Sequence, residues 1–191
     1  MTLEAESAEV IRGLTEEQPR GAPGMVITRG KDGHHHTGRK QRGADGQGFE
    51  LHPAIARGMA QMRESGDVGG AQAVTLFSSP AMHVSYVWFK SGYPLPIHSH
   101  DVDCFYQVFA GSMKVGTEEL GKGDGVMIPA GVPYTVTPGA EGVEFFEFRT
   151  GEDYDTHYRA KTDSYWDRVA ETRRERKAVW AEEKAPYGLL D

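Results

Sequence analysis

The sequence has few of the features that mark several large classes of protein. Its 191 residues contain a single cysteine, Cys104, which excludes an intrachain disulfide and suits a reducing compartment. No apolar run follows the first residue, and no stretch reaches the roughly 20 apolar residues that a membrane-spanning helix needs. The sequence therefore predicts a cytoplasmic protein with no membrane partner.

Basic charge is also scarce. The chain has 21 Lys and Arg residues against 28 Asp and Glu residues, which gives a formal net charge of −7. A nucleic-acid-binding surface would be basic, so we expect no nucleic-acid partner. The glycine patterns of phosphate-binding loops and of dinucleotide-binding folds are missing as well. A nucleotide is therefore a poor expectation for the ligand.

Glycine is abundant, whereas hydrophobic residues are only moderately frequent. The chain has 24 glycines and 38% hydrophobic residues, a balance that favours a β-rich domain with many turns and polar tails. The length is sufficient for one domain with its own core. Within the glycine-rich stretch from Gln18 to Gly48 lies the run His34–His36. We interpret this run as part of a polar loop without a fixed metal geometry.

The most informative stretch runs from Ser91 to Gly111 and contains His98 and His100. Two histidines separated by one residue on a strand point to the same face, because side chains alternate along a strand. Neutral imidazole is a common ligand of first-row metals. The pair is therefore half of a candidate metal site.

The spacing around these histidines resembles the first motif of the cupin superfamily. Gly92 is followed after five residues by His98-x-His100, then after three residues by Cys104, and after six more by Gly111. The second cupin motif is matched by Gly123, five residues, Pro129-x-Gly131, two residues, and Tyr134. Cys104 stands where the superfamily usually has a glutamate, and Tyr134 stands where it usually has a histidine. Two of the four usual metal-ligand positions are thus substituted.

The resemblance implies an all-β fold, namely a single antiparallel double-stranded β-helix (jelly-roll or cupin barrel) of the conserved cupin-2 type. The expected organisation is an N-terminal arm over residues 1–48, a barrel with a preceding helix over 49–150 and a C-terminal helical extension over 151–191. By the same resemblance we expect a homodimer. The long arm and the tryptophans outside the barrel are compatible with that assembly.

Apolar periodicity predicts two helices around the barrel. The first begins at Pro53 and continues to Ser65, with Ile55, Met59 and Met62 facing the barrel. The second runs from Ser164 to Lys184 and is capped by Asp163 or Ser164. Its expected apolar anchors are Trp166, Val169, Val179 and Trp180. We expect residues 151–163 to form a polar connection.

The strands show which side chains share a face but not always which face is inside. The strand from Met82 alternates, with His83, Ser85, Val87 and Phe89 on one face and Met82, Val84, Tyr86 and Trp88 on the other. Either face can be the inner one, so His83 is a candidate ligand or base only in one of the two cases. The strand Val143–Arg149 places Glu147 on a face with Val143 and Phe145, and we expect Pro138-Gly139 to turn the chain before it.

A catalytic metal normally has three protein ligands and an open position. By resemblance, Cys104 and Tyr106 point inward with the histidines, so Cys104 is the first candidate for the third ligand. Such a set would suit a divalent metal such as Fe, Zn, Mn, Ni or Cu. Weaker candidates for the third ligand are Asp101, Asp103, His83, Glu147 and His157.

Two functions follow from this pattern. The first is a small-molecule enzyme of dioxygenase, lyase, isomerase or cyclase type. A divalent metal on His98 and His100 would act on an organic, aromatic or polyketide-like substrate, and Tyr134, Tyr106 or Glu147 would handle protons. The second is a metal-free cupin that binds a small molecule as a sensor or auxiliary protein. The substituted ligand positions favour this alternative, whereas the motif spacing favours the enzyme.

Overall fold

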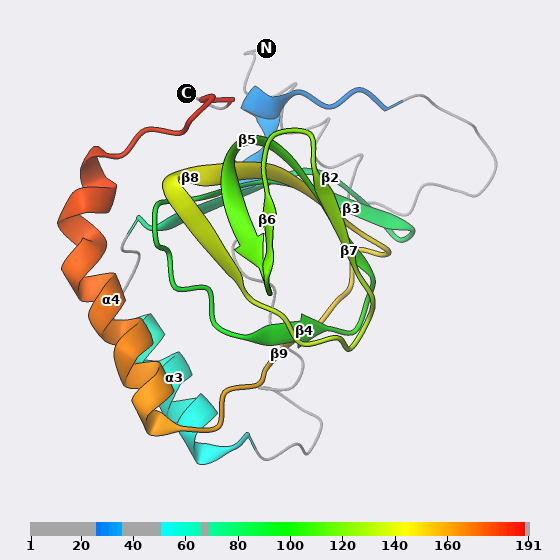
Figure 1. The fold of residues 1–191 in the computed structure, drawn as a ribbon. Coiled ribbons are helices and arrows are strands. Elements are labelled where there is room, and N and C mark those ends of the chain that lie inside the picture. Colours follow the sequence, from blue (N-terminus) through cyan, green and yellow to red (C-terminus); the bar gives the residue numbers. More distant parts are fainter. Residues whose placement is uncertain (1–25, 36–50, 66–68, 190–191) are drawn as a thin grey trace, which may run out of the picture.

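The computed structural model describes residues 26–35, 51–65 and 69–189 (Figure 1). Most of the expected N-terminal arm of residues 1–48 therefore lies outside the described residues. Among the described residues, no helix combines the length and the apolar character that would let it cross a membrane.

The described strands are antiparallel and form a barrel (Figure 1). The larger sheet has the order β1-β2-β3-β8-β5-β6, with β7 also paired to β5, and the smaller sheet pairs β4 with β9. The strands are β1 (His34–His35), β2 (Ala71–Ser79), β3 (Met82–Phe89), β4 (His98–His100), β5 (Cys104–Val115), β6 (Glu118–Leu120), β7 (Gly125–Ile128), β8 (Val136–Arg149) and β9 (Thr156–Tyr158). The predicted all-β antiparallel barrel with flanking helices is confirmed.

Three local predictions were wrong. His34 and His35 belong to β1, where their backbones pair with Thr75 and Val74 of β2, so this part of the run is an edge strand and not a loop. The expected turn at Pro138 is a continuous part of β8, because its pairing with β5 spans this point. The expected polar connection after residue 150 contains β9, which pairs with the short β4.

Two glycines let β5 and β8 pass each other closely. Gly111 and Gly142 both have positive φ values, of 69° and 77°. A Cβ atom built on Gly111 would lie 2.2 Å from the carbonyl oxygen of Gly142. The pairing of β5 with β8 shifts register on either side of Ala110 and Gly111. The motif glycine at 111 is thus explained by a β-bulge and a close backbone approach.

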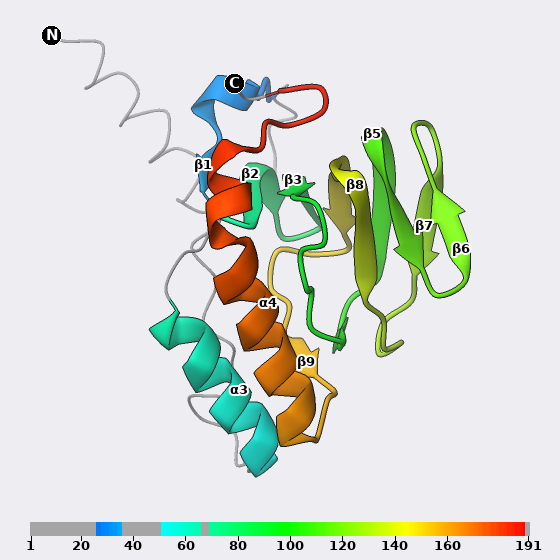
Figure 2. The same ribbon diagram turned by 60° about the vertical axis from the view of Figure 1, so that its left-hand side comes forward.

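The helices α3 (Pro53–Glu64) and α4 (Asp163–Glu182) pack against each other beside the barrel (Figure 2). The predicted start of α3 is confirmed, and the His52 side chain caps it by accepting a hydrogen bond from the Ala54 N–H at 3.3 Å. Ile55 packs against Trp166 of α4, with Met59 and Met62 at the border of that cluster. The expectation that these residues face the barrel was therefore wrong, because α4 covers them.

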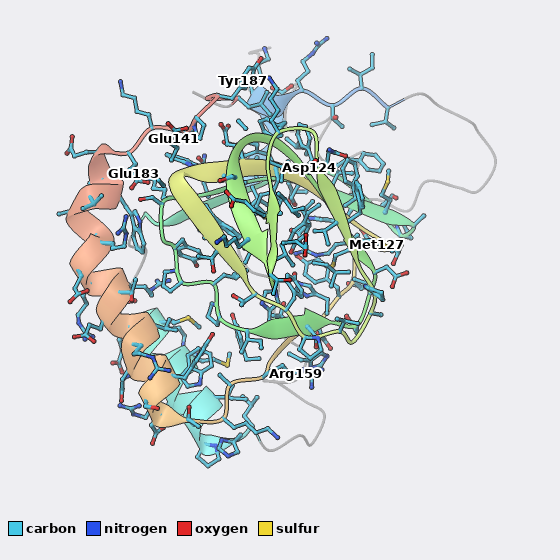
Figure 3. The ribbon with its side chains drawn as sticks, in the orientation of Figure 1. Asp124, Met127, Glu141, Arg159, Glu183 and Tyr187 are labelled. Atoms are coloured by element: carbon cyan, nitrogen blue, oxygen red, sulfur yellow. The ribbon has the colours of Figure 1, made fainter. Side chains whose placement is uncertain are left out.

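The helix α4 begins one residue earlier than predicted, after Thr162, which makes no side-chain cap bond. Trp166, Val169 and Trp180 are buried as expected, but Val179 is exposed. The end of α4 is tied to the barrel through the Trp180 Nε1–H, which donates to the carbonyl oxygen of Ser91 at 2.9 Å. The carboxylate of Glu183, labelled in Figure 3, accepts the Ser91 N–H at 2.9 Å. These bonds hold the segment just before the histidine strand.

Replacement of Gly58 by alanine should destabilise the protein. Gly58 lies in the middle of α3, and a Cβ atom there would be 1.9 Å from Cδ2 of Trp166. Alanine would gain about 1 kcal/mol in helix propensity, but overpacking a core costs typically 1–3 kcal/mol. We expect a net loss of about 1 kcal/mol in the free energy of unfolding, measured by urea denaturation.

The matched control is Ala56→Gly on the exposed face of the same helix, which reports propensity alone. A Gly58→Ala protein that is more stable than the wild type would contradict the close contact of the two helices.

Candidate functional site

The site is built on three neighbouring strands whose inner side chains line up in rungs. Because cross-strand partners point to the same face, the register of β3, β8 and β5 fixes which side chains meet inside the barrel. Read across β3, β8 and β5, the rungs are His83–Arg149–Cys104, Ser85–Glu147–Tyr106 and Val87–Phe145–Val108. Two polar rungs thus lie beside an apolar one.

A cavity of about 270 Å³ opens over these rungs. Its polar wall comes from the histidines of β4, the two polar rungs and the segment before β9, and its apolar wall comes from β2, β3, β8 and the turn before β4. The lining residues are Ala73, Ser85, Val87, Phe89, Leu95, His98, His100, Tyr106, Phe145, Glu147, Arg149, Tyr154, Thr156 and Tyr158. The open question about β3 is thereby answered, because the face that carries His83 is the inner one.

The strand β4 is held on both sides. It pairs with β9 through His98↔Tyr158 and His100↔Thr156, and its other edge forms an isolated bridge between His98 and Tyr134. Both histidines are buried, and their ring centroids lie 4.9 Å apart. The sequence prediction that the two rings share an inner face is confirmed, since both line the cavity.

His98 begins a directed chain of hydrogen bonds. Its Nδ1 lies 2.7 Å from the carbonyl oxygen of Pro96, which can only accept, so Nδ1 carries the proton. Its Nε2 is then an acceptor, and the hydroxyl of Tyr134 lies 3.0 Å from it. The hydroxyl of Tyr106 in turn donates to the Tyr134 oxygen. The nitrogen that would bind a metal is thus engaged by the residue that stands at the usual histidine position.

All members of this chain are neutral at pH 7. Burial, together with the nearby Arg149 charge, lowers the pKa of His98 to about 4 although the bond to Pro96 opposes the shift. Burial raises the pKa of Tyr106 and of Tyr134, and the carboxylate of Glu147 raises both further. The tyrosines are therefore hydrogen-bond donors in this state and not phenolates.

His100 has a different environment. Its Nδ1 lies 3.1 Å from the carbonyl oxygen of Asp155 and 3.3 Å from the hydroxyl of Thr156. Because the carbonyl can only accept, the proton is on Nδ1, and the lone pair of Nε2 is available to bind a metal. Burial, followed by the charge of Arg149, lowers the pKa of His100 to about 3. The ring is thus neutral, which is the form that binds metals.

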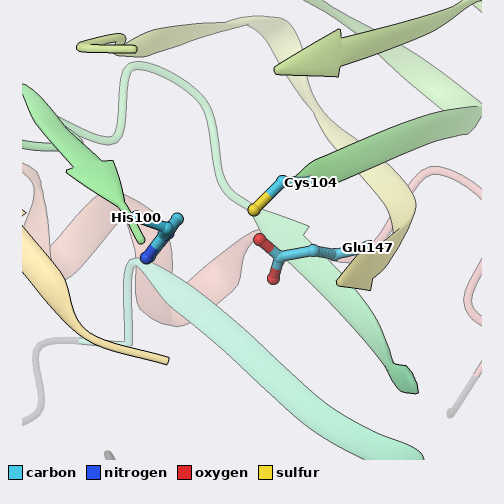
Figure 4. Close-up of side chains that lie close together, drawn as sticks. All are labelled: His100, Cys104 and Glu147. Carbon is cyan, nitrogen blue, oxygen red and sulfur yellow. The ribbon is translucent and has the colours of Figure 1, made fainter. Parts of the chain in front are cut away.

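The side chains of His100, Cys104 and Glu147 lie close together (Figure 4). A ring nitrogen, the sulfur and a carboxylate oxygen of these residues all lie within 4.8 Å of one another. All three side chains are buried. Within the described residues, this is the group of three whose spacing could hold a metal ion.

Glu147 is paired with the buried Arg149. The Nη2 atom of Arg149 lies 2.6 Å from Oε1 of Glu147, and Cζ of Arg149 lies 4.0 Å from the ring centroid of Tyr154. Burial by itself would lower the pKa of Arg149, but the charge of Glu147 together with smaller contributions from Tyr154, Tyr106 and Cys104 raises it, so the guanidinium stays protonated. The positive charge is fixed between a carboxylate and an aromatic ring.

The donor set fits a metal ion. Metal-binding histidines usually donate their second ring N–H to a carbonyl or carboxylate, and metal-binding carboxylates are themselves hydrogen-bonded. His100 has such a partner in the Asp155 carbonyl, and Glu147 is held by its ion pair with Arg149. A nitrogen, a sulfur and an oxygen together suit zinc, iron or copper better than hard ions such as calcium. His98 belongs to this set only if Tyr134 turns away from its Nε2.

Of the five weaker ligand candidates, the structure brings Glu147 into this group and leaves the other four outside it. Asp101 accepts the Asp155 N–H at 2.7 Å, and Asp103 accepts the Ala130 N–H at 2.8 Å, so both stabilise loops. His157 is exposed because it alternates with Thr156 and Tyr158 on β9. His83 is buried beside the cavity, and its Nε2 lies 2.9 Å from the hydroxyl of Ser85.

Sequence reasoning missed Arg149 and Tyr154 as site residues. Arg149 was counted as the last residue of a strand, although its place two residues after Glu147 was a signal that it shares the inner face. Tyr154 lies in the segment interpreted as a polar connection, and its ring makes an edge contact with His100 at a centroid distance of 5.4 Å. No local pattern marked this residue, because β9 forms only through its pairing with β4.

Comparison with known proteins gives structural matches alone. No protein-family model matches the chain, and no curated protein matches its sequence. Among solved structures, an RmlC-like cupin from Shewanella frigidimarina matches with 19% identity over 44% of this chain and 78% of that one, at a TM-score of 0.42. The polyketide cyclase RemF from Streptomyces resistomycificus matches with 18% identity over 55% and 83% of the two chains, at a TM-score of 0.47.

A mutant oxalate decarboxylase from Bacillus subtilis matches with 20% identity over 43% of this chain, at a TM-score of 0.39, and the match spans 26% of that protein. At these identities the likeness concerns the fold, and no function is taken from it. The antiparallel pairing and the positions of the strands in both motifs agree with the sequence prediction. The predicted antiparallel β-barrel is thus confirmed by the strand pairing of the chain itself.

Cys104 should be almost inert in the folded protein. Burial, followed by the nearby Glu147 charge, raises the pKa of its thiol to about 12. A raised thiol pKa means less of the reactive thiolate, roughly one molecule in 10⁴ at pH 8. We expect reaction with a disulfide reagent to be at least about 100-fold slower in the native protein than in urea, as followed by absorbance.

Cys104 is the only cysteine, so every thiol counted belongs to it. Equal rates in buffer and in urea would contradict the buried, protonated thiol.

Proposed function

We propose that the protein is a small-molecule enzyme whose reaction takes place in the barrel cavity, with a divalent metal bound by His100, Cys104 and Glu147. The observation that carries the proposal is the convergence of these three donor groups within 4.8 Å of one another, at a cavity of about 270 Å³ that His100 and Glu147 line. The metal would polarise an oxygen atom of the substrate or bind dioxygen, as in reactions of lyase, isomerase, cyclase or dioxygenase type.

The ligand set extends the one expected from the motif. His98, His100 and Cys104 remain a proposed set, but Glu147 fits the third place better because the His98 Nε2 accepts the Tyr134 hydroxyl. Arg149 would hold the Glu147 carboxylate in place, and the Asp155 carbonyl would fix the His100 ring. A metal bound to Cys104 would also displace its thiol proton.

Tyr106 is the proposed proton donor to the substrate. It lines the cavity, whereas Tyr134 stands behind it and links it to the His98 Nε2. When Tyr106 gives its proton to the substrate, its phenolate would accept a hydrogen bond from the Tyr134 hydroxyl. Tyr106 would then regain a proton from the product or from water, because the His98 Nε2 carries none to supply. Tyr134 and His98 thus act through Tyr106, and Glu147 serves as a ligand.

A metal-free binding protein is the second candidate. It is favoured by the bond between Tyr134 and His98, which uses a nitrogen that a metal would need, and by the charge of Arg149 beside Glu147. Location in the cytoplasm and assembly as a homodimer also stay predictions. Light scattering that gives a mass near twice the 21.0 kDa of one chain would support the dimer.

Metal analysis tests the proposal directly. Protein prepared without an affinity tag and without contact with a nickel column should contain nearly one equivalent of zinc, iron, manganese, nickel or copper. His100→Ala and Glu147→Gln should lose at least about 90% of it, because removal of one of three ligands weakens a site by tenfold or more. Elemental analysis by plasma mass spectrometry measures the content.

The matched control is His157→Ala, which removes an exposed histidine next to β4 and should keep the metal. His34, His35 and His36 are replaced by alanine in every sample, so that the counted metal belongs to the cavity. Loss of the metal in His98→Ala and His100→Ala, but not in Glu147→Gln, would favour the set of His98, His100 and Cys104 expected from the motif. A wild type without metal would refute the metalloenzyme and favour the binding protein.

A further inference from the structure

Arg149 has more hydrogen-bonding capacity than the protein uses. The exposed fraction of its side chain is 9%, and it lines the cavity. Its Nη2 pairs with Glu147, but its Nε–H is buried and has no hydrogen-bond partner among the described residues. A buried donor without an acceptor is costly, so a ligand acceptor that reaches this guanidinium from the cavity would be favoured.

The guanidinium is held in place for such a contact. Tyr154 lies against its Cζ at 4.0 Å from the ring centroid, and Glu147 occupies one of its terminal nitrogens. The N–H groups of a guanidinium point along the edge of its plane and match the two oxygens of a carboxylate. A positioned Arg that lines the cavity and has an unsatisfied N–H is thus a candidate site for a carboxylate.

The rest of the cavity has the opposite character. The wall away from Arg149 is formed by Val87, Phe89, Leu95 and Phe145, and Phe145 packs on Tyr106 with a centroid distance of 4.7 Å. The volume of about 270 Å³ is below the roughly 300–1,000 Å³ typical of pockets for drug-sized ligands. A ligand would therefore be small, with one charged end and an apolar or aromatic body.

We propose that the substrate is a small carboxylic acid with an apolar or aromatic body, and that Arg149 binds its carboxylate. The proposal rests on the proposed function in taking the barrel cavity as the substrate site, but it does not require the metal. It makes Arg149 a specificity-determining residue and places the body of the acid against the rung of Val87 and Phe145.

Glu147 would compete with the ligand for the same guanidinium. It is the one carboxylate that contacts Arg149 among the described residues, at 2.6 Å. Glu147→Gln keeps the shape of the side chain and removes its negative charge. The positive charge of Arg149 would then be less neutralised and would attract the carboxylate of the acid more strongly. The two charged residues of the pair thus have opposite expected effects on acid binding, which a purely structural ion pair would not produce.

The experiment is a thermal-shift and calorimetric titration of the purified protein with acetate, butyrate, phenylacetate and benzoate at pH 7. Each acid is compared with its neutral amide. We expect at least one acid with an apolar body to bind at least tenfold more tightly than its amide and than acetate. Arg149→Lys should weaken this binding at least tenfold, and Glu147→Gln should strengthen it severalfold.

Arg168→Lys on the exposed face of α4 is the matched control and should bind as the wild type does. Circular dichroism verifies that each variant is folded, and lysine at 149 keeps the charge beside Glu147 so that the pair is not broken. The outcome that would overturn the proposal is binding of the amides as tightly as the acids, or no binding of any member of the series. Weakening in Glu147→Gln as large as in Arg149→Lys would also overturn it.

The metal analysis separates this proposal from the proposed function. A wild type that binds acids through Arg149 but contains no metal would refute the metalloenzyme and leave the carboxylate site standing. A wild type that contains metal but prefers no acid over its amide would refute the carboxylate site and leave the metalloenzyme standing.

Discussion

The register of β3 against β8 and of β8 against β5 is the constraint on which the site depends. It places His83, Arg149 and Cys104 in one rung and Ser85, Glu147 and Tyr106 in the next. A shift by one residue would turn every one of these side chains to the outside. The bulge near Gly111 and the close approach to Gly142 keep this register, because no side chain larger than hydrogen fits between the strands there.

The burial of so many ionisable groups is tolerable because their charges are nearly cancelled. The two histidines and the two tyrosines are neutral, and burial keeps the Cys104 thiol protonated. What remains is one carboxylate and one guanidinium in contact, at Glu147 and Arg149. A divalent metal or a carboxylate ligand would each enter next to a group of opposite charge. The same pair therefore suits both proposals without a large unpaired charge.

Much of the fold could be predicted from the sequence. The motif spacing and the alternation of strands indicated the barrel, and apolar periodicity with Pro53 indicated α3 and α4. The errors concern features that depend on a packing or strand-pairing partner, which a local sequence pattern does not identify. The residues Ile55, Met59 and Met62 show an apolar face but not that α4 covers it, and residues 156–158 become a strand only because β4 lies beside them. For the site, the sequence predicted six interior residues, and all of them are buried in the structure: His98, His100, Cys104, Tyr106, Tyr134 and Glu147.

The sequence by itself determined the strand alternation, the shared face of His98 and His100 and the net negative charge of a protein without an intrachain disulfide. The tertiary structure decided which inner side chains meet. It joined Tyr134 to His98, gathered His100 with Cys104 and Glu147, and brought Tyr154 onto Arg149. The reason is physical: alternation along a strand depends on neighbours in sequence, whereas these contacts depend on register and on closure of the barrel, which only residues far apart in the chain can fix.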